Sequence, residues 1–152
     1  MMSCELPNEV KEYIDLVKQG HHRVCREQKA LISYVQRVFE TEDIYVDKKQ
    51  LERYMSLAKY FPFKALFPWE KFLVALWDCT YKPDGLPRWK TILCMVGRGA
   101  GKDGLIAFDA FASISPYNPV LHYDVDICAN NEEQAMRPVQ DVIETLETPG
   151  TE

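Results

Sequence analysis

The sequence predicts an α/β fold in which helices alternate with the strands of a parallel sheet, preceded by an α-helical N-terminal region. Three observations support this prediction. Apolar residues recur at helical spacing in three stretches before residue 62. Two apolar runs, at 90–96 and 121–129, are each followed by a helical pattern, and a glycine-rich turn separates the first run from its helix. Alternating elements of this length are typical of parallel strands joined by right-handed crossovers.

The N-terminal region, residues 1–62, is expected to be a helical lead-in with three amphipathic helices. The first should end at Gly20, the second should span about 22–41, and the third should begin after Asp47 as its N-cap. Their apolar stripes comprise Val10, Tyr13, Ile14 and Val17 in the first, Val24, Leu31, Val35 and Val38 in the second, and Leu51, Tyr54, Met55, Ala58 and Phe61 in the third.

Residues 63–152 are expected to form the α/β part. Pro62 breaks the third helix, and a further apolar helix should run from about Trp69 to Trp77. The Pro- and Gly-containing turn at 82–87 is the best candidate for the boundary after which strands appear. The elements expected beyond it are a strand at 90–96, a helix at 104–114, a loop at 115–119, a strand at 121–129 and a helix at 131–147.

Three local features refine the second half of this part. Asn131 and Gln134 have the spacing of a capping box for the last helix, and Pro138 predicts a kink or a late restart within it. Asp124 and Asp126 alternate with apolar residues and so share one face of their strand. Those two carboxylates could hold a cation, or they could mark a solvated or edge-strand face.

Size and charge set limits on the protein class. The chain has 152 residues, of which 47% are hydrophobic, enough for one core. The net charge of −5 is unevenly distributed, because residues 103–152 hold 1 basic and 10 acidic side chains. A strongly basic face for gripping DNA is therefore not visible in the composition. No apolar run reaches the roughly 18–20 residues that span a bilayer, and the start lacks a signal-peptide layout. We expect a cytoplasmic protein with no membrane association.

Cysteine and histidine give little functional signal. The five cysteines are widely spaced and form no C-x-x-C pair, so they favour neither a metal site nor a disulfide framework. Cys94 and Cys128 are expected to be small buried residues of the two strands. His21 and His22 follow Gly20 between two helical patterns, where a solvated turn is a better reading than a metal site.

The most informative segment is the glycine-rich turn at 97–104, which reads GRGAGKDG. Glycines let backbone N–H groups converge on an anion, the following helix start adds a partial positive charge, and Lys102 can reach terminal phosphates. A buried strand, a glycine turn and a helix in that order form a phosphate cradle. The match to G-x-x-x-x-G-K-[ST] fails at Val96 and Asp103. A tight turn that merely needs glycines is the alternative.

Three segments in register resemble the large terminase subunits of tailed bacteriophages. Arg98-Gly99-Ala100-Gly101-Lys102 resembles the phosphate loop of that family. Residues 67–72 resemble its adenine-side motif, and residues 127–135 resemble the strand-to-helix motif that follows the loop. The resemblance covers about 25–147. It implies an incomplete P-loop NTPase sheet of the RecA/ASCE type, and a parent protein that hydrolyses ATP with Mg²⁺ to drive double-stranded viral DNA into a procapsid.

The same resemblance implies the partners and the roles of individual residues. The partners would be a portal protein and a small terminase subunit, and the parent would form a homo-oligomeric ring in the host cytoplasm. Lys102 would neutralise charge between the β- and γ-phosphates, Arg98 would sense the γ-phosphate, and Asp103 would ligate Mg²⁺. The nucleotide-binding set is Gly97, Arg98, Gly99, Ala100, Gly101, Lys102, Asp103, Gly104, Trp69 and Glu70.

Each implied role has a structural alternative. Trp69 could stack on adenine or could be a core residue at a helix start. Glu70 stands where the family more often has glutamine, so it lacks the donor toward adenine N7. Arg98 could instead pair with a nearby acid. Ala129, Asn130 and Asn131 would couple nucleotide to DNA movement, or would cap the following helix.

One part of an ATPase is missing from the sequence. No apolar strand ending in Asp-Glu, the Walker B strand that holds magnesium and polarises water, follows the loop between 105 and 152, and no nuclease carboxylate cluster is present. We therefore expect an N-terminal piece of a longer protein that cannot turn over ATP alone. The alternatives are another P-loop NTPase, such as a helicase-like domain, and a non-catalytic phage assembly protein with a vestigial phosphate loop.

Overall fold

The computed structural model describes residues 5–20 and 23–148, and these residues form two compact units. Unit 1 comprises the described residues up to Leu51 together with Phe67–Ile92, and unit 2 comprises Glu52–Leu66 together with the described residues from Leu93 onward. The two units interleave along the chain, whereas the expected division at residue 62 separates consecutive segments. The expected division stays a prediction. His21 and His22 lie outside the described residues.

Unit 1 is built around the contact of helices α1 (Asn8–Gln19) and α4 (Pro68–Trp77), and α2 (Arg26–Thr41) also contacts α1. Gly20 ends α1 in the left-handed conformation at φ 72°, as the sequence predicted. The ring centroids of Tyr13 and Phe72 lie 4.7 Å apart across the α1–α4 contact. The buried apolar side chains of this core are Val10, Ile14, Val17, Ile32, Val35, Val38, Phe39, Phe72, Val74, Ala75 and Leu76.

A two-stranded antiparallel ribbon completes unit 1. Strand β1 (Tyr45–Val46) pairs with β2 (Thr80–Tyr81), with Tyr45 opposite Tyr81. Helix α3 (Lys48–Leu57) starts directly after β1, and its first turn is capped as predicted, since the Gln50 N–H donates to Asp47 Oδ1 at 2.9 Å. The helix passes from unit 1 into unit 2 at residue 52.

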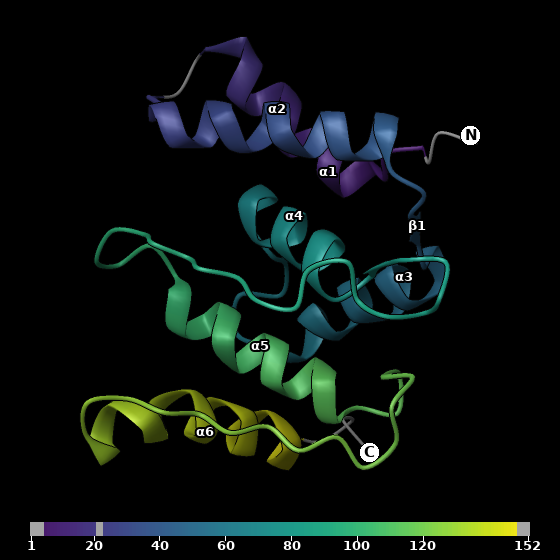
Figure 1. Cartoon of the computed structure of the whole chain (residues 1–152). Coiled ribbons are helices and arrows are strands. Elements are labelled where there is room, and N and C mark those ends of the chain that lie inside the picture. The colour runs from purple at the N-terminus through teal and green to yellow at the C-terminus, as the bar shows by residue number, and fades with distance from the viewer. Residues whose placement is uncertain (1–4, 21–22, 149–152) are drawn as a thin grey trace. The chain divides into compact units, whose positions relative to one another are not determined.

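Unit 2 is built from α5 (Lys102–Ile114) and α6 (Glu132–Glu147), which pack against each other. The two helices run in the same direction, so their N-terminal ends lie at the same end of the unit (Figure 1). The 3₁₀ turn η1 (Ala58–Tyr60) leads into Phe61, whose ring lies 5.8 Å from that of Phe108 and 5.5 Å from that of Phe111. This aromatic cluster anchors α5.

The last helix agrees with its predicted boundaries within one residue. The Gln134 N–H donates to Asn131 Oδ1 at 2.9 Å, so Asn131 is the N-cap. The helix continues without interruption through the buried Pro138, so the late restart considered from the sequence does not occur. Helix α5 begins at Lys102, two residues earlier than predicted, which places the lysine in the first helical turn.

The structure differs from the sequence prediction at 90–96 and 121–129, because neither segment is a strand. Among the described residues, strands occur only at β1 and β2. Side chains that a sheet would bury are exposed, with Leu93 at 84% and Met95 at 86% of their full accessibility, and Cys94 and Cys128 are exposed rather than buried. A strand needs a hydrogen-bonded neighbour, and apolar alternation alone does not supply one. The parallel sheet core, and the P-loop fold class built on it, stay predictions.

The lengths and apolar content of the described helices can be compared with what a membrane span requires. None of those in residues 5–20 and 23–148 is both long enough and apolar enough to cross a lipid bilayer.

Candidate phosphate-binding site

Residues 97–101 form an open turn in unit 2 whose backbone requires glycine at two positions. Gly99 has φ 78° and Gly101 has φ 92°, a left-handed conformation that side-chain-bearing residues seldom adopt. The Ala100 N–H donates to the Gly97 carbonyl oxygen at 3.2 Å and closes the turn. A β-carbon at Gly97 or Gly99 would meet nothing within 4 Å. The space beside Gly97 and Gly99 is therefore open, and their lack of a side chain is not required by a close neighbour.

The turn leads directly into the N-terminus of α5. Gly101 is the N-cap and supplies no side-chain cap, so the amides of the first helical turn are left for another acceptor. The intrahelical ladder starts where the Leu105 N–H donates to the Gly101 carbonyl at 3.1 Å. Free amides together with the helix dipole favour a negative group at this position.

Lys102 and Asp103 occupy the first two helical positions and form an ion pair with each other through Lys102 Nζ and Asp103 Oδ1. Both side chains are about half exposed. Asp103 stands at the position expected for a magnesium ligand, but in this structure its carboxylate is held by the lysine that should contact phosphate. Arg98 is exposed on the turn, and no salt bridge among the described residues includes it.

Packing of an aromatic ring fixes the start of α5. A β-carbon at Gly104 would lie 3.5 Å from the Phe63 ring, an ordinary van der Waals distance. Phe63 itself stacks on Phe61 with ring centroids 5.1 Å apart. The stacked Phe61 and Phe63 rings therefore lie against the start of α5, directly after the glycine turn. This contact fixes the C-terminal end of the turn.

Charged residues of α6 share the electrostatic environment of Asp103. Burial raises the pKa of Asp141, and the negative charges of Glu144 and Asp103 raise it further. The hydrogen bond from Arg137 to Glu133, at 2.9 Å, raises the pKa of Arg137, and the charge of Asp103 adds to this effect. Asp103 therefore interacts electrostatically with one basic and one acidic side chain of α6.

No ready-made metal cage accompanies the loop. Within residues 5–20 and 23–148, no group of three or more His, Cys, Asp or Glu side chains could hold a metal ion. Asp124 and Asp126 are exposed, and they lie outside any strand. A magnesium ion at Asp103 would need most of its ligands from water and phosphate, which is usual for Mg²⁺ bound with a nucleotide.

The two residues expected on the adenine side belong to unit 1, at the start of α4. Glu70 is 5% exposed, and its Oε2 accepts a hydrogen bond of 2.8 Å from the Phe67 N–H. Burial raises the pKa of this carboxyl. Trp69 is partly buried. Glu70 therefore caps a helix in this structure, and its adenine role, like that of Trp69, stays a prediction.

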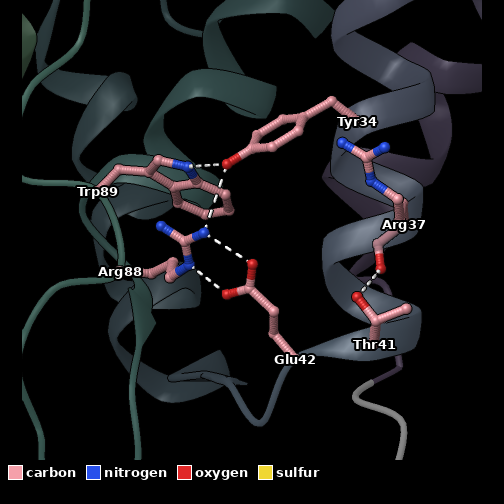
Figure 2. Close-up of polar contacts among 6 residues, drawn as sticks. All are labelled: Tyr34, Arg37, Thr41, Glu42, Arg88 and Trp89. Atoms are coloured by element: carbon pink, nitrogen blue, oxygen red, sulfur yellow. Dashed lines mark hydrogen bonds and ion pairs between the residues drawn. The ribbon is translucent and has the colours of Figure 1, made fainter.

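Arg88 and Trp89 belong to a polar cluster with residues of α2 and with Glu42 (Figure 2). This cluster was not predicted from the sequence. Arg88 donates from Nε to Glu42 Oε2 at 2.6 Å and from Nη2 to Glu42 Oε1 at 2.8 Å. The Arg88 Nη2 and Trp89 Nε1 groups each lie 3.4 Å from the Tyr34 hydroxyl oxygen. Glu42 and Arg88 are far apart in sequence, so no local pattern could have indicated their pairing.

The cluster ties the end of α2 to the segment that follows β2. The Arg88 guanidinium lies 5.1 Å from the Trp89 ring centroid, and that of Arg37 lies 5.8 Å from the Tyr34 ring. The hydrogen bonds from Arg88 hold the pKa of Glu42 below its usual value. Arg88, Glu42 and the Tyr34 hydroxyl are hydrogen-bonded to one another or to Trp89, so we assign the cluster a structural role within unit 1.

Comparison with known proteins adds no relative: no family model, no curated protein and no solved structure matches this chain.

Proposed function

We propose that residues 97–104 bind the polyphosphate tail of a nucleotide, and that the chain is the ATP-binding part of a terminase-type DNA-packaging motor. One observation carries the phosphate assignment. A turn with left-handed Gly99 and Gly101 opens into an uncapped helix N-terminus, and Lys102 is the first residue of that helix. Backbone amides, helix dipole and a lysine together supply the three elements of phosphate binding.

The roles follow from the chemistry of each group. The amides between Gly99 and Asp103 would donate to phosphate oxygens, and the Lys102 ammonium would neutralise charge between the β- and γ-phosphates. Arg98 is exposed beside the turn and can offer a planar pair of donors to the γ-phosphate. Asp103 would contribute one oxygen to Mg²⁺.

The DNA-packaging part of the proposal rests on the resemblance of three sequence motifs. In such a motor, ATP hydrolysis moves double-stranded DNA into a procapsid, in a homo-oligomeric ring with a portal protein and a small terminase subunit as partners. The sequence from 105 to 152 contains no Asp-Glu pair after an apolar strand. We therefore propose nucleotide binding for this chain and assign it no turnover of its own.

The test is ATP binding by calorimetry in the presence of Mg²⁺, with Lys102→Ala as the test variant. Wild type should bind, and Lys102→Ala should lose about tenfold or more in affinity, the effect of removing roughly 1.4 kcal/mol of interaction. Lys90→Ala is the matched control, because Lys90 is an exposed lysine of unit 1 outside the loop. Equal affinities for wild type and Lys102→Ala would refute the assignment.

A non-catalytic assembly protein with a vestigial loop is the second candidate. It is favoured by the capture of Lys102 by Asp103 and by the use of Glu70 as a helix cap, since both groups are engaged within the protein. Absence of ATP binding by the wild-type chain, with and without Mg²⁺, would select this candidate.

A further inference from the structure

Helix α6 carries a second apolar stripe beside the face that it buries. The buried residues of the helix are Pro138, Val142 and Thr145, and α6 packs against α5. The apolar residues outside this buried face form what we call the α6 stripe: Met136, Val139, Ile143 and Leu146. Three of them directly follow a buried residue, so the α6 stripe is turned by about 100° around the helix axis from the buried face.

The α6 stripe has the spacing by which one helix packs along another. Its members lie at i, i+3, i+7 and i+10, the alternation of three and four residues found in paired helices. Met136, Ile143 and Leu146 are each between 38% and 51% exposed, and Val139 is partly buried. Apolar residues scattered singly over a surface are ordinary, whereas a continuous row marks an interaction site. A strand would contact alternate residues, so the occupant that fits this row is a helix.

The charges of α6 define the partner further. The helix has five acidic residues and one basic residue. The single base, Arg137, is hydrogen-bonded to Glu133 at 2.9 Å. Glu144 and Glu147 are exposed beside the α6 stripe, and neither forms a salt bridge with another described residue. Because like charges oppose the pairing of α6 with a second copy of itself, the acidic flank selects a positively charged helix.

We propose that α6 is a docking surface for an amphipathic helix of a partner protein, one that presents an apolar row flanked by lysine or arginine. The two apolar rows would bury each other, and the basic flank would pair with Glu144 and Glu147. One helical row is smaller than the about 800 Å² per partner of a typical stable interface, so this contact alone should be weak and sensitive to salt. The α6 stripe shares no residue with the proposed nucleotide site at 97–104, and its test requires no nucleotide.

The experiment uses two fluorescently labelled synthetic peptides of about three heptads, both with leucine at the apolar positions. One peptide has lysine at the flanking positions and the other has glutamate. Fluorescence anisotropy measures the binding of each peptide to the full 152-residue chain. At low salt the lysine-flanked peptide should bind at least about tenfold more tightly than the glutamate-flanked peptide. Its affinity should fall as sodium chloride is added, because salt screens the pairing of exposed charges.

Three variants locate the binding surface. Ile143→Ser combined with Leu146→Ser removes two exposed members of the α6 stripe and should weaken binding of the lysine-flanked peptide about tenfold. Glu144→Lys combined with Glu147→Lys keeps the stripe and should reverse the preference between the two peptides. Leu93→Ser is the matched control, because Leu93 is 84% exposed in unit 2 outside α6, and this variant should bind like wild type. Circular dichroism of each variant checks that the helices are retained.

Several outcomes would refute the proposal. Neither peptide may bind, or both may bind equally, and either result removes the basic helix as the occupant. Equal binding of the lysine-flanked peptide to wild type and to the Ile143/Leu146 double variant would show that the peptide binds elsewhere. Sedimentation equilibrium of the wild-type chain tests the other occupant. A dimer that the double variant abolishes would identify α6 of a second copy as the helix that covers the stripe, and would overturn the assignment to a basic partner.

Discussion

The Arg88–Glu42 pair offers the most direct test of how unit 1 is held together. We expect Arg88→Ala to lower the free energy of unfolding by about 1–2 kcal/mol. The pair is bidentate, with bonds of 2.6 and 2.8 Å, which places it above ordinary surface pairs. The Glu42 side chain is 40% exposed, so water can solvate it once the partner is gone, which limits the loss.

The assay is urea denaturation followed by tryptophan fluorescence. With a denaturant slope of about 2 kcal/mol per molar, the midpoint should fall by about 0.5–1 M. Arg26→Ala is the matched control, because Arg26 and Glu27 also form an ion pair, but with 92% and 72% exposed side chains. The urea midpoint of this control should not differ measurably from that of wild type. Arg88→Lys should be intermediate, since an ammonium cannot reproduce the bidentate contact.

The pH dependence of folding stability tests the same ion pair independently. Arg88 lowers the pKa of Glu42 in the folded state below its ordinary value of 4.5. The stabilisation is therefore complete above pH 4.5 and is lost as the pH falls through the lower pKa of the folded state. The stability difference between wild type and Glu42→Gln should shrink over that acidic window. Equal urea midpoints for Arg88→Ala and Arg26→Ala would refute the reasoning. A stability difference between wild type and Glu42→Gln that did not change with acidification would also refute it.

Two further predictions concern the helix cap and the unpaired segments. Glu70→Gln should still accept the hydrogen bond from the Phe67 N–H and should stabilise the fold by up to about 1 kcal/mol at neutral pH, because it removes a buried charge. Burial raises the pKa of Glu70 in the folded state, so this gain should shrink as the pH falls below the raised value and should be gone below the ordinary value of 4.5. A gain that persists at low pH would contradict this reasoning. Amides at 91–97 and 123–129 should exchange with solvent much faster than those of α5 when followed by hydrogen exchange and mass spectrometry. Protection of both segments would instead show that they are paired as strands.

The helices were predictable because their signals are local. The i, i+3, i+4 stripe of α1, the stop at Gly20 and the caps at Asp47 and Asn131 each involve residues within one or two turns. The candidate site was predictable for the same reason, since residues 97–104 are contiguous. The order of a glycine turn and then a helix follows from one short stretch of sequence, although the helix begins at Lys102 and not at residue 104 as predicted.

The Lys102–Asp103 pairing and the role of Glu70 were harder to foresee. The motif predicts Asp103 as a metal ligand, which stays a prediction, and in the structure Asp103 forms an ion pair with Lys102. The motif predicts a base contact for Glu70, whereas in the structure its carboxylate accepts a hydrogen bond from the Phe67 N–H and so caps α4. In both cases a residue expected to face a ligand is engaged by a near neighbour in the chain.

The sequence by itself determined which segments become helices, the caps at Asp47 and Asn131, and the glycine turn that precedes α5, because each depends on backbone conformations and contacts within a few residues. Only the tertiary structure decided that Phe61 packs on Phe108 and Phe111, that Arg88 forms an ion pair with Glu42, and that residues 90–96 and 121–129 form no strand. These depend on partners distant in sequence. Whether a segment becomes a strand is decided by hydrogen bonds to a second segment, and an apolar pattern in the first cannot specify that the second is in place.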